Sequence, residues 1–266
     1  GLPDRGRPPL AVTPGVVELH DGVPGRPQPR RQPRRLPGRL LGGRYREKVK
    51  PYASILMEMP DLMRERAAEL AVPSCVVIFE PQPREFFGPD TAPARLTRLR
   101  DKLALLAAEG VDMVLCLAFN RRLRELSAAE FVQRVLVDGL GVKDLEIGDD
   151  FRFGCDRAGD VEFLKAAGQR YGFSVDASTT VEVLGGRVSS TRVRQALVDG
   201  DFELAEALLG RPFRIAGRVL HGQKLGRQLD APTANIQLKR RKVPLTGVYL
   251  VSCAIDGVIQ PGVANI

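Results

Sequence analysis

The sequence predicts an α/β protein whose middle part is a parallel sheet covered by helices and whose C-terminal part is a smaller all-β domain. Two observations predict this fold. Between residues 62 and 210, apolar runs of strand length alternate with segments of helical spacing, which is typical of a parallel sheet. From residue 211 onward the runs are short and rich in β-branched residues, without a long helical period between them. A chain of 266 residues is long enough for two such domains.

The first helices and strands follow from leucine spacing and from breaker residues. A helix over Leu62–Leu70 precedes the apolar run Cys75–Phe79, which stops before two closely spaced prolines. Leucines over Leu96–Leu106 recur at three- and four-residue spacing, and Gly110 ends this helix. The run Val111–Ala118 is then a second buried strand.

The later elements are predicted from capping signals in the same way. Ser127 and Glu130 form a capping box that opens a helix running to about Gly139. Ser189 or Ser190 caps another helix that ends near Gly200. The remaining expected elements are helices over 159–172 and 201–209 and strands over 145–147, 173–175, 180–183, 213–220, 234–238 and 247–255.

Charge and composition separate the first fifty residues from the rest. They contain twelve Lys and Arg against four Asp and Glu, so the whole net charge of +8 lies there. They also hold nine of the 20 prolines and eight of the 27 glycines, and proline prevents a helix or central strand. We therefore expect residues 1–61 to be a disordered or aberrant basic segment. Non-specific contact of residues 26–50 with nucleic-acid phosphates is one alternative, but Tyr45 is their single stacking residue, so no specific nucleic-acid partner is expected.

Several classes of protein are excluded by composition. No stretch of eighteen apolar residues is present, so a membrane-embedded protein is not expected. The four widely spaced cysteines fit neither a disulfide framework nor a metal site, which favours a cytoplasmic protein. With only His20 and His221, a histidine-rich metal centre is excluded and a Ser-His-Asp hydrolase is disfavoured.

Two loops after predicted parallel strands carry polar residues, and ligands bind beyond the carboxyl ends of such strands. In Phe79–Pro83 the proline pair holds the Gln82 amide in a fixed orientation, or simply stops the strand. The loop Gly148–Gly154 contains Asp149, Asp150, Phe151 and Arg152, a set that can clamp a planar heterocycle and its polar edge. An Asp-Gly turn with aromatics packed beneath it explains this loop equally well.

A third loop starts the helix near Ser190 and favours an anion. It contains Ser189, Ser190, Thr191, Arg192 and Arg194. Free backbone amides, hydroxyls and guanidinium groups at a helix N-terminus bind anions, most naturally phosphate. A simple serine cap with exposed arginines is the alternative. A cap alone does not require three hydroxyl residues and two arginines, so a phosphate site is favoured.

The all-β part carries a second phosphate-type pattern. The basic loop 217–227, which includes Gly222 and Lys224, can wrap a polyphosphate with backbone amides, although this pattern is weak evidence by itself. Thr233 and Asn235 then alternate onto one face of a strand and offer two neutral oxygens suited to Mg²⁺ that keeps waters and phosphate ligands. An ordinary polar edge of a sheet has the same pattern.

Taken together, these strings resemble the bacterial bifunctional riboflavin kinase/FAD synthetase family over about residues 62–266. The motifs occur in family order, and the resemblance is carried by residues 79–83, 94–100, 148–154, 159–160, 189–194, 217–226, 232–236, 247–249 and 262–266. It implies a Rossmann-like nucleotidylyltransferase domain over 62–210 that joins FMN and ATP into FAD. It also implies a partial flavokinase-type β-barrel over 211–266 that phosphorylates riboflavin with ATP and Mg²⁺.

The resemblance also implies roles for single residues. Ser189, Ser190, Thr191, Arg192, Arg194 and Gln82 would bind the nucleotide, and Asp149, Asp150, Phe151, Arg152 and Asn120 would line the flavin site. In the kinase part, Gly222, Lys224, Thr233 and Asn235 would meet ATP, with Thr233 and Asn235 as the Mg²⁺ ligands. The small-molecule partners implied are ATP, FMN and riboflavin.

Two departures from the family pattern predict an impaired enzyme as the alternative, one that binds flavin or ATP without turnover. The family opens with a Gly-Asn-Phe-Asp-Gly-x-His-x-Gly-His loop that this chain lacks, so no catalytic residue is assigned. The family's kinase base lies beyond Ile266, so the second domain is expected to be cut short. Residues 31–38 can be back-translated so that the next frame reads Gly-Asn-Pro-Asp-Gly-Phe-Pro, which makes a frameshift one hypothesis for the N-terminal segment and a genuine extension the other.

Overall fold

The computed structural model describes residues 15–19, 52–54, 60–178, 181–220, 233–255 and 258–266. The chain divides into two compact units. One contains the described residues between 28 and 93 together with residues 98–187, and the other contains residues 15–19, 94–97 and the described residues from 188 onward. Within the described residues, no helix is long and apolar enough to span a bilayer.

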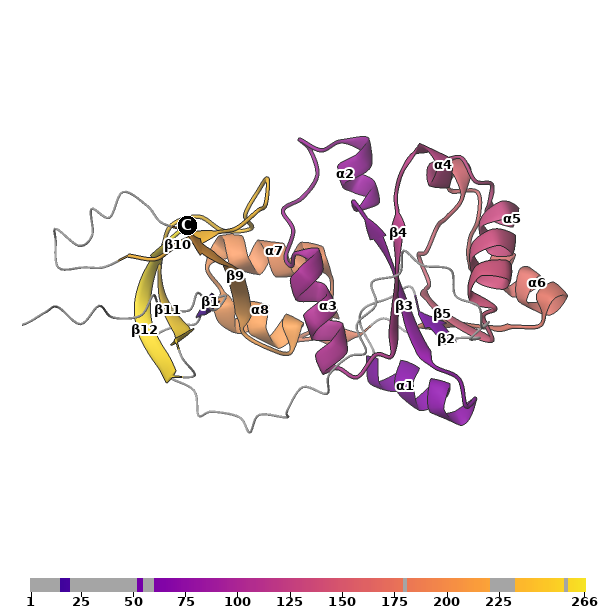
Figure 1. Ribbon diagram of the computed structural model, residues 1–266, viewed down its shortest axis with the longest axis horizontal. Helices are drawn as coiled ribbons and strands as arrows, with labels where there is room; N and C mark the ends of the chain where they lie inside the picture. The colour runs from indigo at the N-terminus through magenta and orange to yellow at the C-terminus, as the bar shows by residue number, and fades with distance from the viewer. Residues whose placement is uncertain (1–14, 20–51, 55–59, 179–180, 221–232, 256–257) are drawn as a thin grey trace, which may run out of the picture. The chain divides into compact units, whose positions relative to one another are not determined.

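The first unit is built on a five-stranded sheet in which every neighbouring pair is parallel (Figure 1). The strand order is β4-β3-β2-β5-β6. The strands are β2 (Tyr52–Ser54), β3 (Ser74–Glu80), β4 (Met113–Ala118), β5 (Asp144–Gly148) and β6 (Ser174–Ser178). The short pair β7 (Glu182–Val183) and β8 (Gly186–Arg187) follows β6. The predicted parallel α/β fold is therefore confirmed.

Helices lie between the strands of this unit. They are α1 (Pro60–Glu69), α2 (Pro83–Phe87), α3 (Leu99–Ala108), α4 (Arg121–Arg124), α5 (Ala128–Phe131), the π-helix η1 (Val132–Leu140), the 3₁₀ turn η2 (Cys155–Arg157) and α6 (Val161–Tyr171). The predicted capping box is confirmed, since Ser127 Oγ accepts from Glu130 N at 3.2 Å and Glu130 Oε2 accepts from Ser127 N at 3.0 Å. The helix opened by this cap continues as η1.

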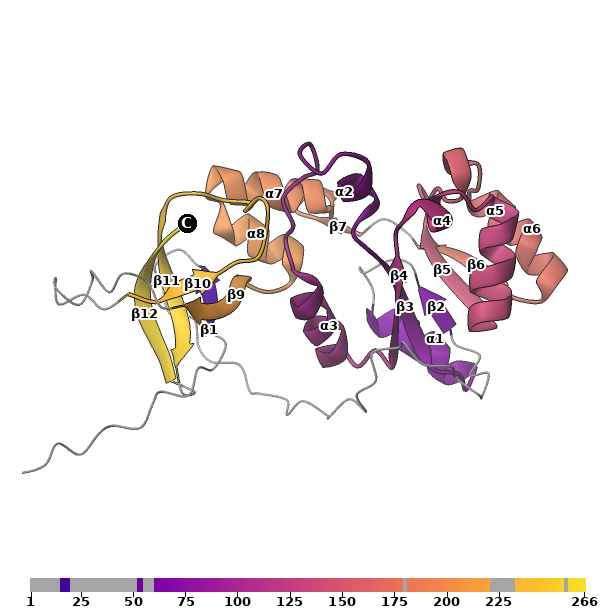
Figure 2. The same cartoon turned by 45° about the horizontal axis from the view of Figure 1, so that its top comes forward.

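Strand β3 shows how the sequence buries both faces of the sheet. Cys75 and Val77 point into a core formed with α5, η1 and α6, whereas Val76 and Ile78 point into a second core formed with α1 and α3. Successive strand residues face opposite sides, so a continuous apolar run requires helices on both faces. Figure 2 shows α5 and α6 together on one side of the strands.

In its described part, the second unit combines two helices with a five-stranded antiparallel sheet. The helices are α7 (Ser190–Asp199) and α8 (Phe202–Leu209), and the strands are β1 (Gly15–Leu19), β9 (Phe213–Leu220), β10 (Asn235–Gln237), β11 (Val248–Ile255) and β12 (Val258–Asn265). The sheet order is β10-β9-β1-β11-β12, and all four pairs are antiparallel. Among the described residues this sheet is open, so a closed barrel is not confirmed.

Several elements differ from those predicted. Two pieces of the segment 1–61, for which no strand was expected, are the strands β1 and β2, and the segment's other residues before Pro60 lie outside the described part of the chain. Residues 15–19 contain no proline; they pair with β9 over their whole length and with β11 over residues 17–19, so long-range pairing stabilises a strand that local composition disfavours. Helices α2 and α4 and strand β8 are additional to the prediction.

Candidate functional site

The carboxyl edge of the parallel sheet is where a ligand is expected. The chain runs from β2 outward to β4 and then returns to β5 on the opposite side of β2. In such a sheet, ligands bind outside the carboxyl ends of the strands at the point where the order reverses. The loops after β3, β4 and β5 therefore carry the side chains of interest in this unit.

The loop after β3 leads directly into helix α2. Gln82 caps this helix: its backbone N donates to Glu85 Oε2 at 3.1 Å, and its backbone O accepts from Glu85 N at 2.9 Å. The sequence predicts either a fixed Gln82 amide or a strand stop at the two prolines, and no helix after them. Pro83 at the first helical position and a glutamate two residues later are nevertheless helix-start signals, so α2 was readable from the sequence.

Helix α2 carries an aromatic cluster that sequence reasoning missed. The rings of Phe79, Phe86 and Phe87 pack edge-on around Phe119, with centroids 5.9, 5.4 and 6.0 Å from it. The Arg124 guanidinium lies 5.5 Å from the Phe87 ring centroid. Because Phe87 is 63% exposed, the cluster presents an aromatic face to solvent. The adjacent phenylalanines at 86 and 87, which lie in the segment after the predicted strand, were the available signal.

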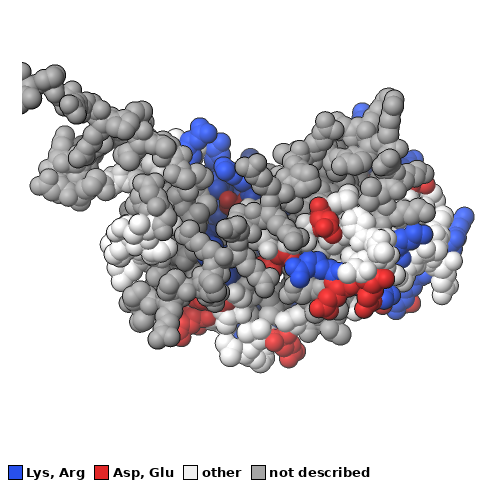
Figure 3. Space-filling model, turned by 60° about the horizontal axis from the view of Figure 1, so that its bottom comes forward, with Lys and Arg blue, Asp and Glu red and all other residues white. Residues whose placement is uncertain are grey.

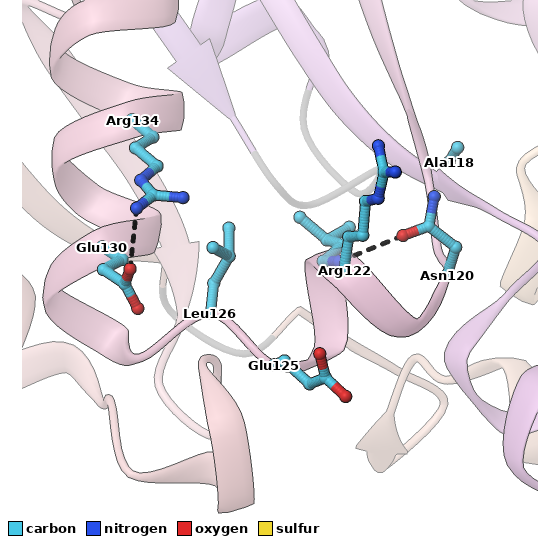
Figure 4. A pocket seen from close by; sticks show the side chains of 8 residues that line it. Ala118, Asn120, Arg122, Glu125, Leu126, Glu130 and Arg134 are labelled. Carbon is cyan, nitrogen blue, oxygen red and sulfur yellow. Dashed lines mark hydrogen bonds and ion pairs between the residues drawn. The ribbon is translucent and has the colours of Figure 1, made fainter.

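Asn120 follows β4 and lines a pocket of about 560 Å³. Its Oδ1 accepts from Leu123 N at 3.1 Å, which caps helix α4. The other lining residues are Ala118, Arg122, Leu123, Glu125, Leu126, Glu130 and Arg134. Figure 4 shows Arg122 and Asn120 on the α4 side of the pocket and the Glu130–Arg134 ion pair, 2.8 Å long, on the α5 side. Hydrogen bonds from Ser127, with Arg134 nearby, lower the pKa of Glu130. The pocket therefore offers two carboxylates, two guanidinium groups and an amide around apolar side chains.

The loop after β5 places its two carboxylates in solvent. Asp149 and Asp150 are both exposed, and Arg187 of β8 lies 3.8 and 3.6 Å from them. Arg187 was not predicted as a site residue, because no local pattern links a strand at residue 187 to a loop at residue 149. The structure brings these three side chains together.

The aromatic residues of the same loop pack inward. The Phe151 ring stacks on Phe153 with centroids 5.6 Å apart and an interplanar angle of 14°, and Phe153 is only 7% exposed. Arg152 pairs with Asp160 at 3.2 Å, and Asp160 also caps helix α6. Phe151 thus rests on the hydrophobic core, which is the arrangement of the turn that the sequence also allowed.

Helix α7 of the second unit begins with the predicted hydroxyl residues. Ser189 caps the helix, since its Oγ accepts from Arg192 N at 3.2 Å. Ser190 and Thr191 are exposed beside it, in the first turn. Arg194 is engaged elsewhere: its Nε donates to the backbone O of Ala94 at 2.6 Å. The structure therefore leaves Ser189, Ser190 and Thr191 at the helix end and directs Arg194 toward a backbone carbonyl.

The predicted kinase residues are only partly described. Gly222 and Lys224 lie outside the described residues. Thr233 and Asn235 are exposed, and Asn235 pairs with Leu220 across β9 and β10. One hydroxyl and one amide oxygen two residues apart fit Mg²⁺, which prefers hard oxygen ligands and retains waters. Over the described residues no group of three or more His, Cys, Asp or Glu side chains could hold a metal.

The fold and these loops define a two-part protein, a parallel α/β unit followed by an antiparallel β unit. The model of the FAD synthetase family matches residues 58–192, and the riboflavin kinase model matches residues 209–266. The chain belongs to the FAD synthetase family.

Curated relatives agree with this assignment. The chain is 72% identical to the bifunctional riboflavin kinase/FMN adenylyltransferase of Pseudomonas fluorescens over 204 residues, covering 77% of this chain and 65% of that protein. It is 51% identical to the enzyme of the same name from Escherichia coli K12 over 205 residues, covering 77% and 66%. The chain thus spans slightly less than two thirds of the length of these relatives.

A solved structure has the same fold. The crystal structure described as a macrolide-efflux protein from Streptococcus pneumoniae superposes with a TM-score of 0.67 and 27% identity, covering 81% of this chain and 74% of that chain. This likeness supports the fold of the chain.

Proposed function

We propose that the chain acts in FAD biosynthesis. The α/β part, residues 62–210, would transfer the adenylyl group of ATP to FMN, giving FAD and pyrophosphate. Residues 211–266, as part of a flavokinase-type β-barrel, would phosphorylate riboflavin to FMN with ATP. The single observation that carries this proposal is the family match over both parts, with relatives named as bifunctional enzymes. Those names do not favour the alternative of a relative that only binds its ligands.

The flavin is assigned to the edge formed by the loops after β3, β4 and β5. An isoalloxazine ring is planar and apolar with a polar edge, so it suits the exposed Phe87 face and the polar groups around Asn120. Asp149, Asp150 and Arg152 would contact the flavin's polar groups or its ribityl chain. Phe151 would support this loop from beneath, because it is stacked on buried Phe153.

The nucleotide phosphates are assigned to the N-terminus of α7. The first amides of a helix are free to bind anions, and Ser189, Ser190 and Thr191 add hydroxyl groups there. Arg192 supplies positive charge in the first turn, and Gln82 is assigned to the nucleotide as well. In the transfer an FMN phosphate oxygen forms a bond to the α-phosphorus of ATP while the bond to the pyrophosphate oxygen breaks. In a transfer of this kind, catalysis consists largely of positioning the two reactants in line.

In the kinase part, Thr233 and Asn235 would hold Mg²⁺ together with ATP, and Gly222 and Lys224 would meet the ATP phosphates. When bound, Mg²⁺ supplies charge neutralisation on the phosphates. On the right of the view in Figure 3, Lys and Arg side chains lie among Asp and Glu. As in the sequence analysis, no specific nucleic-acid partner is proposed. The cytoplasmic location expected from the sequence stays a prediction.

Product analysis tests the proposal directly. The purified chain is incubated with FMN, ATP and Mg²⁺, and separately with riboflavin, ATP and Mg²⁺, and the flavins are separated by chromatography. FAD in the first reaction and FMN in the second are expected. A chain that forms neither product and does not bind FMN at equilibrium would overturn the proposal.

A matched pair of variants tests the flavin site. Phe87→Ala removes the exposed ring beside Arg124, whereas Tyr171→Ala removes a ring on α6 that has Arg170 at 5.2 Å. Phe87→Ala is expected to weaken FMN binding, measured by quenching of flavin fluorescence, about tenfold, in line with 1–3 kcal/mol for one stacked aromatic. Tyr171→Ala is expected to leave it unchanged. Equal affinities of the two variants would remove Phe87 from the site.

A further inference from the structure

Two arginines hold adjacent carbonyl groups of one short segment, Ala94–Thr97. Arg194 Nε donates to Ala94 O at 2.6 Å, and Arg240 Nη1 donates to Arg95 O at 3.1 Å. All of these residues belong to the second compact unit, although the segment lies 100 and 145 positions from its two partners. A segment of four residues is thus fixed at two successive peptide groups.

The two arginines come from different parts of the sequence. Arg194 is in α7, one turn beyond the hydroxyl residues assigned to phosphate. Arg240 follows β10 and lies in the range matched by the riboflavin kinase model, residues 209–266. The contact to Arg95 therefore joins the kinase-type part to the segment that also binds α7.

Both hydrogen bonds are of a kind that can hold segment 94–97 and the two arginine side chains in fixed positions. A guanidinium donating to a neutral carbonyl makes a charge-assisted hydrogen bond, and its planar shape restricts the direction of that bond. Arg194 and Arg240 are both only partly exposed, which reduces competition from water. The Ala94 carbonyl keeps Arg194 Nε in one place, and Arg240 keeps the next peptide group from moving.

We propose that Arg240 is a positioning residue for the nucleotide site at α7. It holds segment 94–97, this segment holds Arg194, and Arg194 fixes the orientation of the first turns of α7, which carry the phosphate-binding hydroxyl groups. A residue of the kinase-type part thereby sets the ATP affinity of the adenylyltransferase part. The inference rests on the proposed function, because it takes α7 as the ATP phosphate site.

The test compares ATP binding and local mobility in the full chain and three variants. Arg240→Ala removes the contact to Arg95, Arg240→Lys keeps the charge and one donor, and Lys239→Asn removes a neighbouring exposed charge. Asparagine tolerates the positive φ of 47° at position 239, so this control does not introduce backbone strain. Thermal unfolding of each variant verifies that it is folded.

Arg240→Ala is expected to raise the Kd for ATP about three- to tenfold, the size expected for losing one hydrogen bond. Amide hydrogen exchange in a peptide covering residues 94–99 is expected to accelerate in parallel. In the adenylyl-transfer assay the KM for ATP rises while kcat stays near the unaltered value. Arg240→Lys recovers part of the affinity, and Lys239→Asn matches the unaltered chain in every measurement.

The outcomes separate the inference from the function on which it rests. If the unaltered chain binds ATP and Arg240→Ala binds it equally well, with unchanged exchange over 94–99, the positioning role is wrong and the proposed function stands. If the unaltered chain binds neither ATP nor FMN, the proposed function itself is wrong, and the inference is overturned with it. If Arg240→Ala changes kcat and leaves the KM for ATP unchanged, Arg240 does not act through nucleotide binding.

Discussion

Arg66 Nε donates to Asp144 Oδ2 at 2.9 Å, which joins helix α1 to the amino end of β5. The Asp144 side chain is completely buried, whereas that of Arg66 is 41% exposed. Loss of Arg66 would leave the Asp144 carboxylate buried without a cationic partner, which is strongly unfavourable. This cost is larger than the favourable energy of the ion pair itself. Its place at the amino edge of the sheet, opposite the carboxyl ends of the strands, gives it a structural role.

Arg66→Ala is therefore expected to lower the free energy of unfolding of the α/β unit, measured by urea denaturation. Arg66 also pairs with Glu69 at 2.9 Å, and the Glu69 side chain is 64% exposed. Glu69→Ala removes this exposed pair alone and should have little effect. If the two variants unfold at the same urea concentration, the buried carboxylate does not depend on Arg66.

The thiol of Cys75 predicts a loss of stability at alkaline pH. Burial raises the pKa of this thiol from 9.0 to about 12. Above pH 9 the unfolded chain releases a proton that the folded chain retains, so the free energy of unfolding falls as pH rises toward 12, by at most about 1.4 kcal/mol per pH unit. Below pH 9 this contribution is fully present.

Cys75→Ala should unfold with a shallower pH dependence between pH 9 and 11 than the unaltered chain, measured by urea denaturation at each pH. Cys253→Ala is the control, because this thiol is partly exposed on β11. Parallel pH profiles for all three proteins would contradict the assignment of the shifted pKa to Cys75.

Local signals predicted much of the fold. Strand β3 and helices α7 and α8 agree closely with the prediction, because apolar runs and capping residues act over a few neighbours. The glycines at 172, 200 and 210 end their helices with positive φ, as glycine at that position permits.

The sequence did not predict elements that are stabilised by residues far away in the chain. Strand β1 exists between β9 and β11, more than 190 residues away in sequence, and its own composition gives no sign of them. The residues of the candidate site divide in the same way, into positions that local capping signals predict and contacts that only the tertiary fold creates. Asn120 and Ser189 occupy helix caps, whereas the contacts of Arg187 with Asp149 and of Arg194 with Ala94 depend on the tertiary fold.

Gly154 fixes the end of the loop after β5, and its replacement predicts a measurable cost. Its φ is +75°, and a Cβ there would lie 2.6 Å from the backbone N of Ala128 at the start of α5. Gly154→Ala is expected to destabilise the chain by about 2–3 kcal/mol through backbone strain and this contact. The urea midpoint measures the effect.

The variant Gly172→Ala distinguishes the cost of backbone strain from the cost of the contact with Ala128. Gly172 has a similar φ of +77°, but nothing lies within 4 Å of a Cβ built there. We expect Gly172→Ala to cost about 1 kcal/mol, the strain alone. A Gly154→Ala variant no less stable than Gly172→Ala would show that the contact with Ala128 is relieved without cost.

Arg187 is predicted to hold the carboxylates of the loop after β5, which we propose to contact the flavin. It lies 3.8 Å from Asp149 and 3.6 Å from Asp150, and without it two adjacent carboxylates would repel each other and the phosphate of FMN. Arg187→Ala should raise the Kd for FMN about two- to tenfold at low ionic strength, measured by flavin fluorescence. The Arg187 side chain is 46% exposed, so its charge is screened by salt as other surface charges are. The difference in the Kd for FMN between Arg187→Ala and the unaltered chain should therefore become smaller at 0.5 M salt. Arg170→Ala, which removes a charge from the end of α6, should bind FMN as the unaltered chain does. A difference between Arg187→Ala and the unaltered chain that persists undiminished at high salt would point to a direct hydrogen bond to the ligand in place of charge neutralisation.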